Sequence, residues 1–106
     1  MSADALAQTL VTAIEGELAA LAAEDADAIA RATAEKVAAL TDLQAAVAGG
    51  AQPPRPLLEQ ARDLNAQAIL QSRAKMRAVE KRLAALRADP LPVRAPLVYG
   101  RDGRWA

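Results

Sequence analysis

The sequence of 106 residues contains no cysteine, no histidine and no phenylalanine, and its only aromatic residues are one tyrosine and one tryptophan. Without cysteine the chain can form no disulfide and has no thiolate nucleophile, which is typical of proteins of the reducing cytoplasm. Without histidine it lacks the commonest general base and metal ligand of proteins. Its five glycines form no phosphate-binding loop. We therefore expect a binding protein and not an enzyme, with no cofactor and no metal.

Long apolar runs are also missing, since no stretch approaches the length of a bilayer span and no basic-then-apolar signal peptide opens the chain. These absences predict a soluble, cytoplasmic protein. Hydrophobic residues make up 53% of the sequence, but most are alanine, the best helix former and a small contributor of buried area. The composition predicts an all-α fold, either an elongated antiparallel helical bundle or a coiled-coil hairpin.

The first helical pattern repeats leucine or isoleucine every three or four residues, at Leu6, Leu10, Ile14, Leu18 and Leu21. Extending this stripe would bury Asp25, and an unpaired buried carboxylate is costly. We therefore predict helices over about 3–24 and 26–48, with Asp25 as the N-cap of the second. No glycine or proline lies at this point, so the alternative is one kinked helix over about 3–48, which leaves two helices instead of three.

The second stripe comprises Ile29, Thr33, Val37, Leu40, Leu43 or Gln44, and Val47, with Glu35 and Lys36 expected on its solvated side. Gly49-Gly50 and the following prolines end it. Pro56 can then open a third helix over about 56–88. That helix has apolar residues at Leu57, Ala61, Leu64, Ala68, Met76, Val79, Leu83 and Leu86. The middle of this apolar pattern is interrupted by the polar residues Asn65, Gln67, Gln71 and Ser72. The interruption either fixes the register of a helix seam or marks the place where another helix enters the seam.

Charge is divided unevenly along the chain. Residues 1–50 carry eight acidic and two basic residues, whereas residues 51–106 carry eleven basic and five acidic ones. Two such halves can pair with one another, and this pairing sets orientation more than stability. The basic third helix could also bind nucleic acid, but it has no aromatic residue for base stacking and contains Glu80. We expect a solvated or internally paired face.

The last 18 residues, 89–106, differ from everything before them. They contain Pro90, Pro92 and Pro96 together with the only tyrosine and tryptophan, Tyr99 and Trp105. Prolines end a helix and favour an extended run. We predict two parts, a helical bundle over 1–88 and an extended tail over 89–106 that the bundle presents to a partner.

Three segments of the chain carry a resemblance to a known family. Residues 33–40, Thr-Ala-Glu-Lys-Val-Ala-Ala-Leu, and residues 61–65, Ala-Arg-Asp-Leu-Asn, are similar to the second helical segment and to the return helix of the FlgN family of flagellar type III export chaperones. The tail segment 96–103, Pro-Leu-Val-Tyr-Gly-Arg-Asp-Gly, is similar to the terminal Leu-Tyr-Gly-x-Asp-Gly pattern of the family. The chain is shorter than is usual there, and Ala66-Gln67-Ala68 replaces a more polar stretch.

The resemblance implies a cytoplasmic chaperone that binds the C-terminal amphipathic segment of hook-associated proteins and delivers them to the cytoplasmic domain of the export gate protein FlhA, without nucleic acid or membrane insertion. It implies that the third helix holds the client, at Leu64, Asn65, Ala68, Ile69, Ser72, Met76, Val79 and Leu83. It implies docking to the export gate through the tail, at Tyr99, Gly100, Asp102 and Gly103. The alternative from the residues alone is a self-associating coiled-coil adaptor with no export role.

Overall fold

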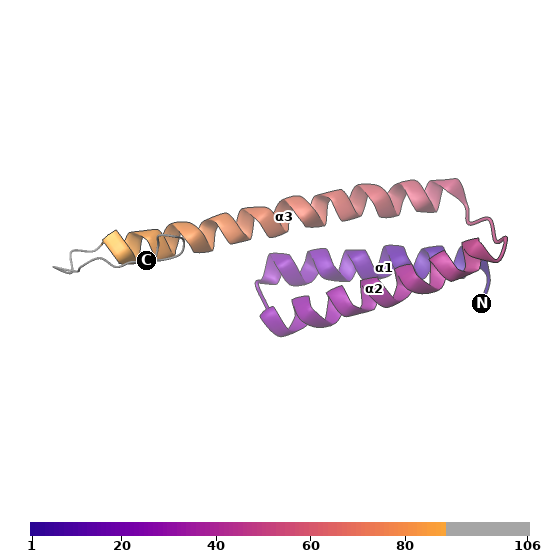
Figure 1. The fold of residues 1–106 in the computed structure, drawn as a ribbon, viewed down its shortest axis with the longest axis horizontal. Coiled ribbons are helices and arrows are strands. Elements are labelled where there is room, and N and C mark those ends of the chain that lie inside the picture. The colour runs from indigo at the N-terminus through magenta and orange to yellow at the C-terminus, as the bar shows by residue number, and fades with distance from the viewer. Residues whose placement is uncertain (89–106) are drawn as a thin grey trace. The chain divides into compact units, whose positions relative to one another are not determined.

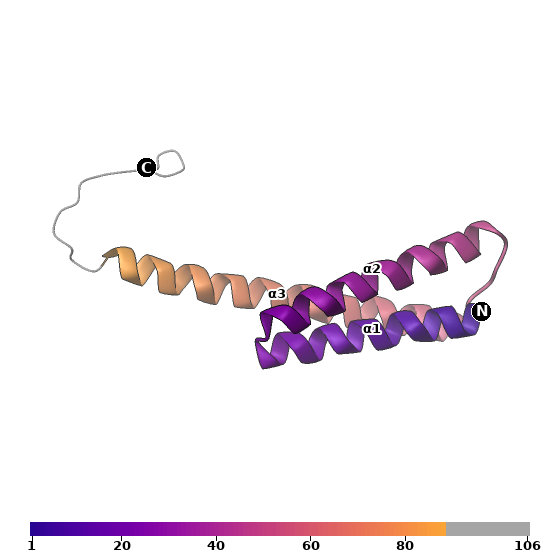
Figure 2. The same cartoon turned by 90° about the horizontal axis from the view of Figure 1, so that it is seen from below.

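The computed structural model describes residues 1–88, and these form three α-helices: α1 (Ala3–Ala23), α2 (Ala26–Ala48) and α3 (Arg55–Ala88). The described residues contain no strand, so the predicted all-α class is confirmed. Figures 1 and 2 show α1 and α2 side by side and antiparallel, joined by a very short connection. The predicted tail over 89–106 lies outside the described residues.

The chain turns between α1 and α2 at Glu24 and Asp25. Glu24 lies in the left-handed region with φ of 56°, and its N–H donates to the carbonyl of Leu21 at 3.1 Å. Asp25 has extended backbone, and its carboxylate accepts a hydrogen bond from the N–H of Ala28 at 3.1 Å. The predicted break and the N-cap role of Asp25 are confirmed, and a single kinked helix over 3–48 is wrong. A carboxylate cap substitutes here for the glycine or proline that usually marks a helix boundary.

Glycine and proline form the second connection. The N–H of Gly49 donates to carbonyls of the last turn of α2, and Gly50 has φ of 102°, a conformation that side chains rarely adopt. Pro54 then provides carbonyl acceptors for the N–H groups of Leu57 and Leu58 at 3.1 and 3.2 Å. Helix α3 therefore begins at Arg55, one residue before the predicted start at Pro56.

The chain divides into two compact units, Met1–Ala74 and a second unit that begins at Lys75. The first unit contains α1, α2 and the first part of α3, and its core joins side chains from all three. Leu10, Val11 and Ile14 form the centre of this core, and Leu6, Leu57 and Leu64 pack against it half-buried. The remaining core positions are mostly alanine: Ala7, Ala39, Leu43 and Ala61.

The face of α2 that packs into the first unit agrees only in part with the predicted one. Leu43 of the predicted stripe is buried, but Ala32 and Ala39 are the other buried positions, whereas Val37 is 55% exposed and Leu40 and Val47 are also exposed. The predicted stripe followed the large side chains, but alanine lets two helix backbones approach closely and so fills a helix interface equally well. The prediction that Lys36 lies on the solvated side is wrong as well, because its side chain is only 21% exposed.

Helix α1 has the length and apolar composition of a membrane-crossing helix, and it is the one such helix within residues 1–88. The expectation that no stretch approaches this length was wrong, because alanine raises the hydropathy of α1 without adding large side chains. A core helix of a soluble protein meets the same criterion, and 44% of the relevant window is buried inside the structure.

Candidate functional site

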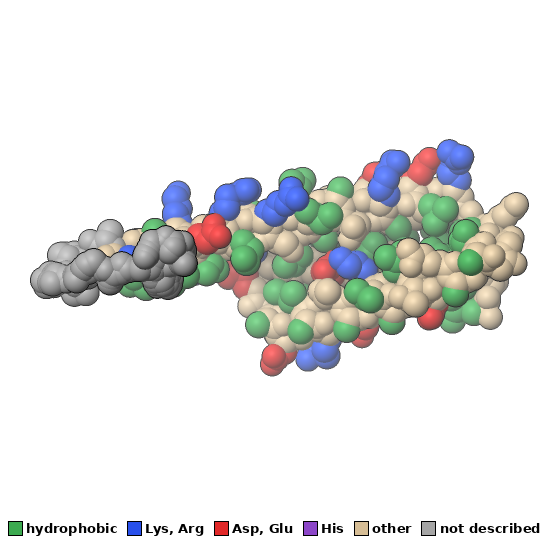
Figure 3. Space-filling view, viewed as in Figure 1, with side chains coloured by type: hydrophobic (Ala, Val, Ile, Leu, Met, Phe, Trp, Pro, Cys, Tyr) green, Lys and Arg blue, Asp and Glu red, His purple; other side chains and the backbone are tan. Residues whose placement is uncertain are grey.

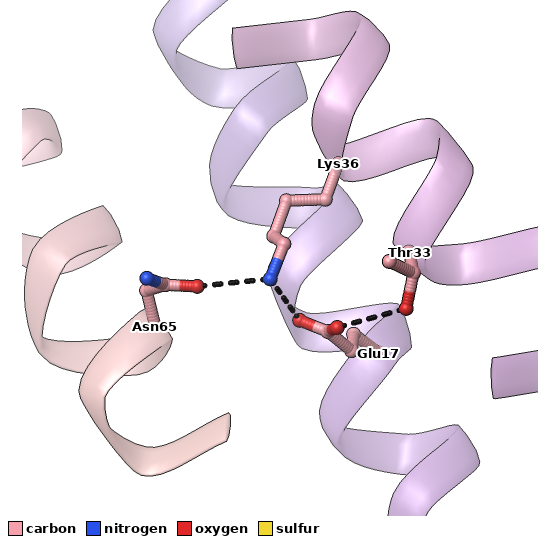
Figure 4. Close-up of polar contacts among 4 residues, drawn as sticks. All are labelled: Glu17, Thr33, Lys36 and Asn65. Carbon is pink, nitrogen blue, oxygen red and sulfur yellow. Dashed lines mark hydrogen bonds and ion pairs between the residues drawn. The ribbon is translucent and has the colours of Figure 1, made fainter. Parts of the chain in front are cut away.

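A cluster of four polar side chains lies between the three helices of the first unit (Figure 4). At its centre is Glu17 of α1, which is only 6% exposed. One carboxylate oxygen accepts a hydrogen bond from the Lys36 ammonium at 2.9 Å, and the other accepts from the Thr33 hydroxyl at 3.0 Å. The same ammonium donates to the side-chain oxygen of Asn65 at 3.1 Å. The cluster thus links α1, α2 and α3 through one lysine.

The energetics of this polar cluster indicate a structural role. A buried carboxylate is tolerated when it is paired and hydrogen-bonded, and both oxygens of Glu17 have donors. Such a pair adds little stability over a well-packed apolar pair, but it strongly disfavours arrangements that leave the charge alone. We infer that Glu17 fixes the register of α1 against α2, and that Lys36 extends this constraint to Asn65 of α3.

Sequence reasoning missed this cluster, although its signal was present. Residues 10, 14, 17 and 21 continue the apolar spacing of three and four that begins at Leu6, so Glu17 lies on the buried stripe. The predicted stripe instead passes through Leu18, which is half-buried in the structure. A charged residue on an apolar stripe signals a buried partner of opposite charge, and Lys36 is that partner.

The predicted client-binding residues fall into two groups. In the first unit Leu64 packs against the core, Asn65 bonds to Lys36, and Ala68 is 2% exposed. These three residues already have contacts within the chain. Ser72 is half-buried and Ile69 is exposed.

The second group lies in residues 75–88 and is exposed. Met76, Val79 and Leu83 belong to it, and Leu86, which was in the predicted stripe but not among the predicted client contacts, completes it. Met76 is 60% and Leu86 68% exposed, and the other two are nearly half exposed. The spacing of three, four and three residues places all four on one narrow face of α3. We call these four residues the α3 stripe.

Nearly all charged residues of the described part of the second unit are basic. Lys75, Arg77, Lys81, Arg82 and Arg87 are exposed or half-exposed, against the single acidic residue Glu80. Blue side chains are prominent along α3 in the space-filling view of Figure 3. The candidate site for a partner is therefore an apolar stripe on a basic helix.

The predicted gate-docking residues Tyr99, Gly100, Asp102 and Gly103 lie outside the described residues. Within the part of the chain that the structure describes, no group of three or more histidine, cysteine, aspartate or glutamate side chains is placed to hold a metal ion. Comparison of the chain with protein-family models, with curated proteins and with solved structures finds no match.

Proposed function

We propose that this chain is a cytoplasmic flagellar export chaperone similar to the FlgN family, which binds the C-terminal amphipathic segment of hook-associated proteins and delivers them to FlhA. The observation that carries the proposal is the α3 stripe, an exposed row of four large apolar side chains on one helix face. An amphipathic helix is recognised through apolar anchors at this spacing. The similarity of residues 96–103 to the terminal pattern of the family supports the choice of client.

The three helices differ in length, and this difference bears on how much of α3 the other two can cover. At about 1.5 Å per residue, α1 and α2 with 21 and 23 residues are about 32 and 35 Å long, whereas α3 with 34 residues is about 51 Å long. Neither α1 nor α2 can therefore pair with the whole of α3. The four stripe residues are exposed, so their apolar face suits a partner helix from another protein.

The size of the stripe suits a client that must later be released. Burying a large aliphatic side chain completely contributes about 1.5–3 kcal/mol, and these four begin roughly half exposed, so their burial contributes about 3–6 kcal/mol. The apolar face of the client contributes a comparable amount. The loss of translational and rotational freedom on association, together with the ordering of side chains, costs about 4–15 kcal/mol and opposes both contributions. The stripe alone predicts weak, reversible binding.

The decisive experiment measures binding of a purified C-terminal segment of a hook-associated protein to the full chain by isothermal titration calorimetry. We expect 1:1 binding that is lost in the double variant Val79→Ser/Leu83→Ser. The matched control is Ala78→Ser/Ala85→Ser, which changes two exposed positions of the same helix away from the stripe. Circular dichroism checks that both variants stay folded. Client binding that survives the stripe variant, or is lost equally in the control, contradicts the proposal.

In this proposal α3 binds the client and the tail docks to the export gate. Tyr99 is the tail residue that corresponds to the docking tyrosine of the family, so Tyr99→Ala should leave client binding intact and weaken binding to the cytoplasmic domain of FlhA. Calorimetry with each partner in turn separates the two effects. Equal loss of both interactions contradicts this division.

A second candidate function is a self-associating adaptor without an export role. The observation that favours it is the exposed apolar face of α2, with Val37, Leu40 and Val47 at the spacing of a helix seam. Light scattering separates the two functions. A stable oligomer at low micromolar concentration, together with no binding to hook-associated segments, supports the adaptor.

A further inference from the structure

The edges of the α3 stripe carry mostly positive charge. With Met76 and Leu83 at one heptad position of the seam and Val79 and Leu86 at the other, helical periodicity places Lys75 and Arg82 along one edge. The same periodicity places Arg87 and the single acidic residue, Glu80, along the opposite edge. The edges of a helical seam set partner choice, because their charges meet those of the facing helix.

Three kinds of occupant fit these edges poorly. In a second copy of the same stripe, repulsion of Arg82 by Arg87 or by Lys75 offsets the attraction that Glu80 offers, so the edges give self-pairing no net gain. An anionic membrane surface favours a wide apolar face with aromatic residues, whereas this stripe is narrow and has none. Nucleic acid would leave four exposed apolar side chains without contacts. A helix with acidic edges satisfies both the stripe and its charges.

We propose that the α3 stripe selects amphipathic helices whose seam-flanking positions are acidic, so that charge decides which client segment is accepted. This inference rests on the proposed function, because it specifies the chemistry of the client at that same site. Opposite charges speed the encounter and exclude basic helices. Binding through the apolar contacts of the stripe is weak by itself. Ion pairs at the edges strengthen it only when the partner helix has acidic edges.

The test uses the full chain and three synthetic amphipathic helices with identical leucine seams and with glutamate, glutamine or lysine at every flanking position. Three basic edge residues and one acidic one favour glutamate by a net two pairs and disfavour lysine by two. Each exposed ion pair changes affinity by about 1.4-fold to fivefold, so we expect the glutamate peptide to bind at least about fourfold more tightly than the lysine peptide. The glutamine peptide should lie between them. The difference should shrink as salt is raised from about 0.1 to 1 M, where the Debye length falls from about 10 to 3 Å.

A matched pair of charge reversals locates the effect. Arg82→Glu changes an edge residue, whereas Lys81→Glu makes the same change in net charge on the side of the helix opposite the stripe. Arg82 is exposed and donates only a long hydrogen bond of 3.4 Å to the carbonyl of Ala78, so the helix should tolerate its replacement. We expect Arg82→Glu to weaken the glutamate peptide by about twofold to tenfold and to strengthen the lysine peptide. Lys81→Glu should change both by less than about twofold.

Three results would overturn the inference: equal affinity for the three peptides, equal effects of the two reversals, or binding to anionic vesicles without preference among the peptides. Failure of the inference differs from failure of the proposed function. If hook-associated segments bind through the stripe but the peptides show no charge preference, only the inference fails. If the charge preference holds and no hook-associated segment binds, the proposed client is wrong.

Discussion

Removal of either charge of the Glu17–Lys36 pair should destabilise the first unit, but by unequal amounts. The Glu17 side chain is 7% exposed and the Lys36 side chain 21% exposed. Lys36→Met leaves a nearly inaccessible carboxylate with only the Thr33 hydroxyl as donor. Glu17→Leu leaves an ammonium that still has Asn65 as acceptor and can reach water. We therefore expect Lys36→Met to be the more damaging change.

The magnitudes follow from the burial of each partner. Stranding a buried charge costs about 3–5 kcal/mol, so we expect Lys36→Met to lower the free energy of unfolding by about 3 kcal/mol. Glu17→Leu should lower it by about 1 kcal/mol or less, because leucine suits the apolar stripe of α1 and the partly exposed Lys36 ammonium keeps Asn65 as an acceptor. The double variant should recover most of the loss, since an apolar pair of similar volume replaces a buried ion pair at little cost. The coupling energy between the two positions should be about 3 kcal/mol.

Urea denaturation followed by far-ultraviolet circular dichroism measures all four proteins of this cycle. Arg31→Met is the matched control, because Arg31 is an exposed cation on the same helix, and its loss should change stability by less than about 0.5 kcal/mol. The reasoning is refuted if Glu17→Leu is more damaging than Lys36→Met, or if the double variant is as unstable as the sum of the single ones. Either result would mean that the carboxylate is not held by the lysine.

Further predictions concern the turn and the alanine interfaces, and all are measured by the same denaturation experiment. Asp25→Ala removes the N-cap acceptor of α2 and should cost about 1 kcal/mol, whereas Asp25→Asn keeps an acceptor and should be nearly neutral. Glu24→Gly should raise stability by about 0.5–1 kcal/mol because glycine adopts φ of 56° without steric cost, and a loss would contradict this. Ala68→Leu should lower stability by about 1–3 kcal/mol through overpacking, while Ala66→Leu on the exposed side of α3 should not.

The sequence predicted the type of the helices and their boundaries to within about one residue, while leaving one kinked helix over 3–48 as an alternative to two. Capping and turn residues act locally, so Asp25 and Gly49-Gly50 could be recognised without knowledge of the rest of the fold. The face by which α2 packs could not be predicted in the same way. Two of its three buried positions are Ala32 and Ala39, and alanine occurs on every side of that helix. A stripe defined by the large side chains therefore includes the buried Leu43 but also the exposed Val37 and Leu40.

The candidate site was predictable in part for a related reason. Large apolar residues at Met76, Val79 and Leu83 stand out in the sequence, but their periodicity does not tell whether another part of the chain covers them. Leu64 and Ala68 follow the same periodicity in the first unit, where Leu64 is half-buried and Ala68 buried. The prediction that residues 99–103 dock to the export gate does not depend on helix packing. It comes only from their similarity to a family pattern.

The position of Asn65 connects the internal fold of α3 with its proposed role. Asn65 accepts the Lys36 hydrogen bond within the stretch where the apolar pattern of the helix becomes polar, and four exposed apolar side chains follow between residues 76 and 86. A buried polar contact tolerates few alternative registers, whereas an apolar seam of leucine and alanine tolerates several. Asn65 therefore has a structural role within the first unit, and the exposed stripe that carries the proposed client contacts begins at Met76.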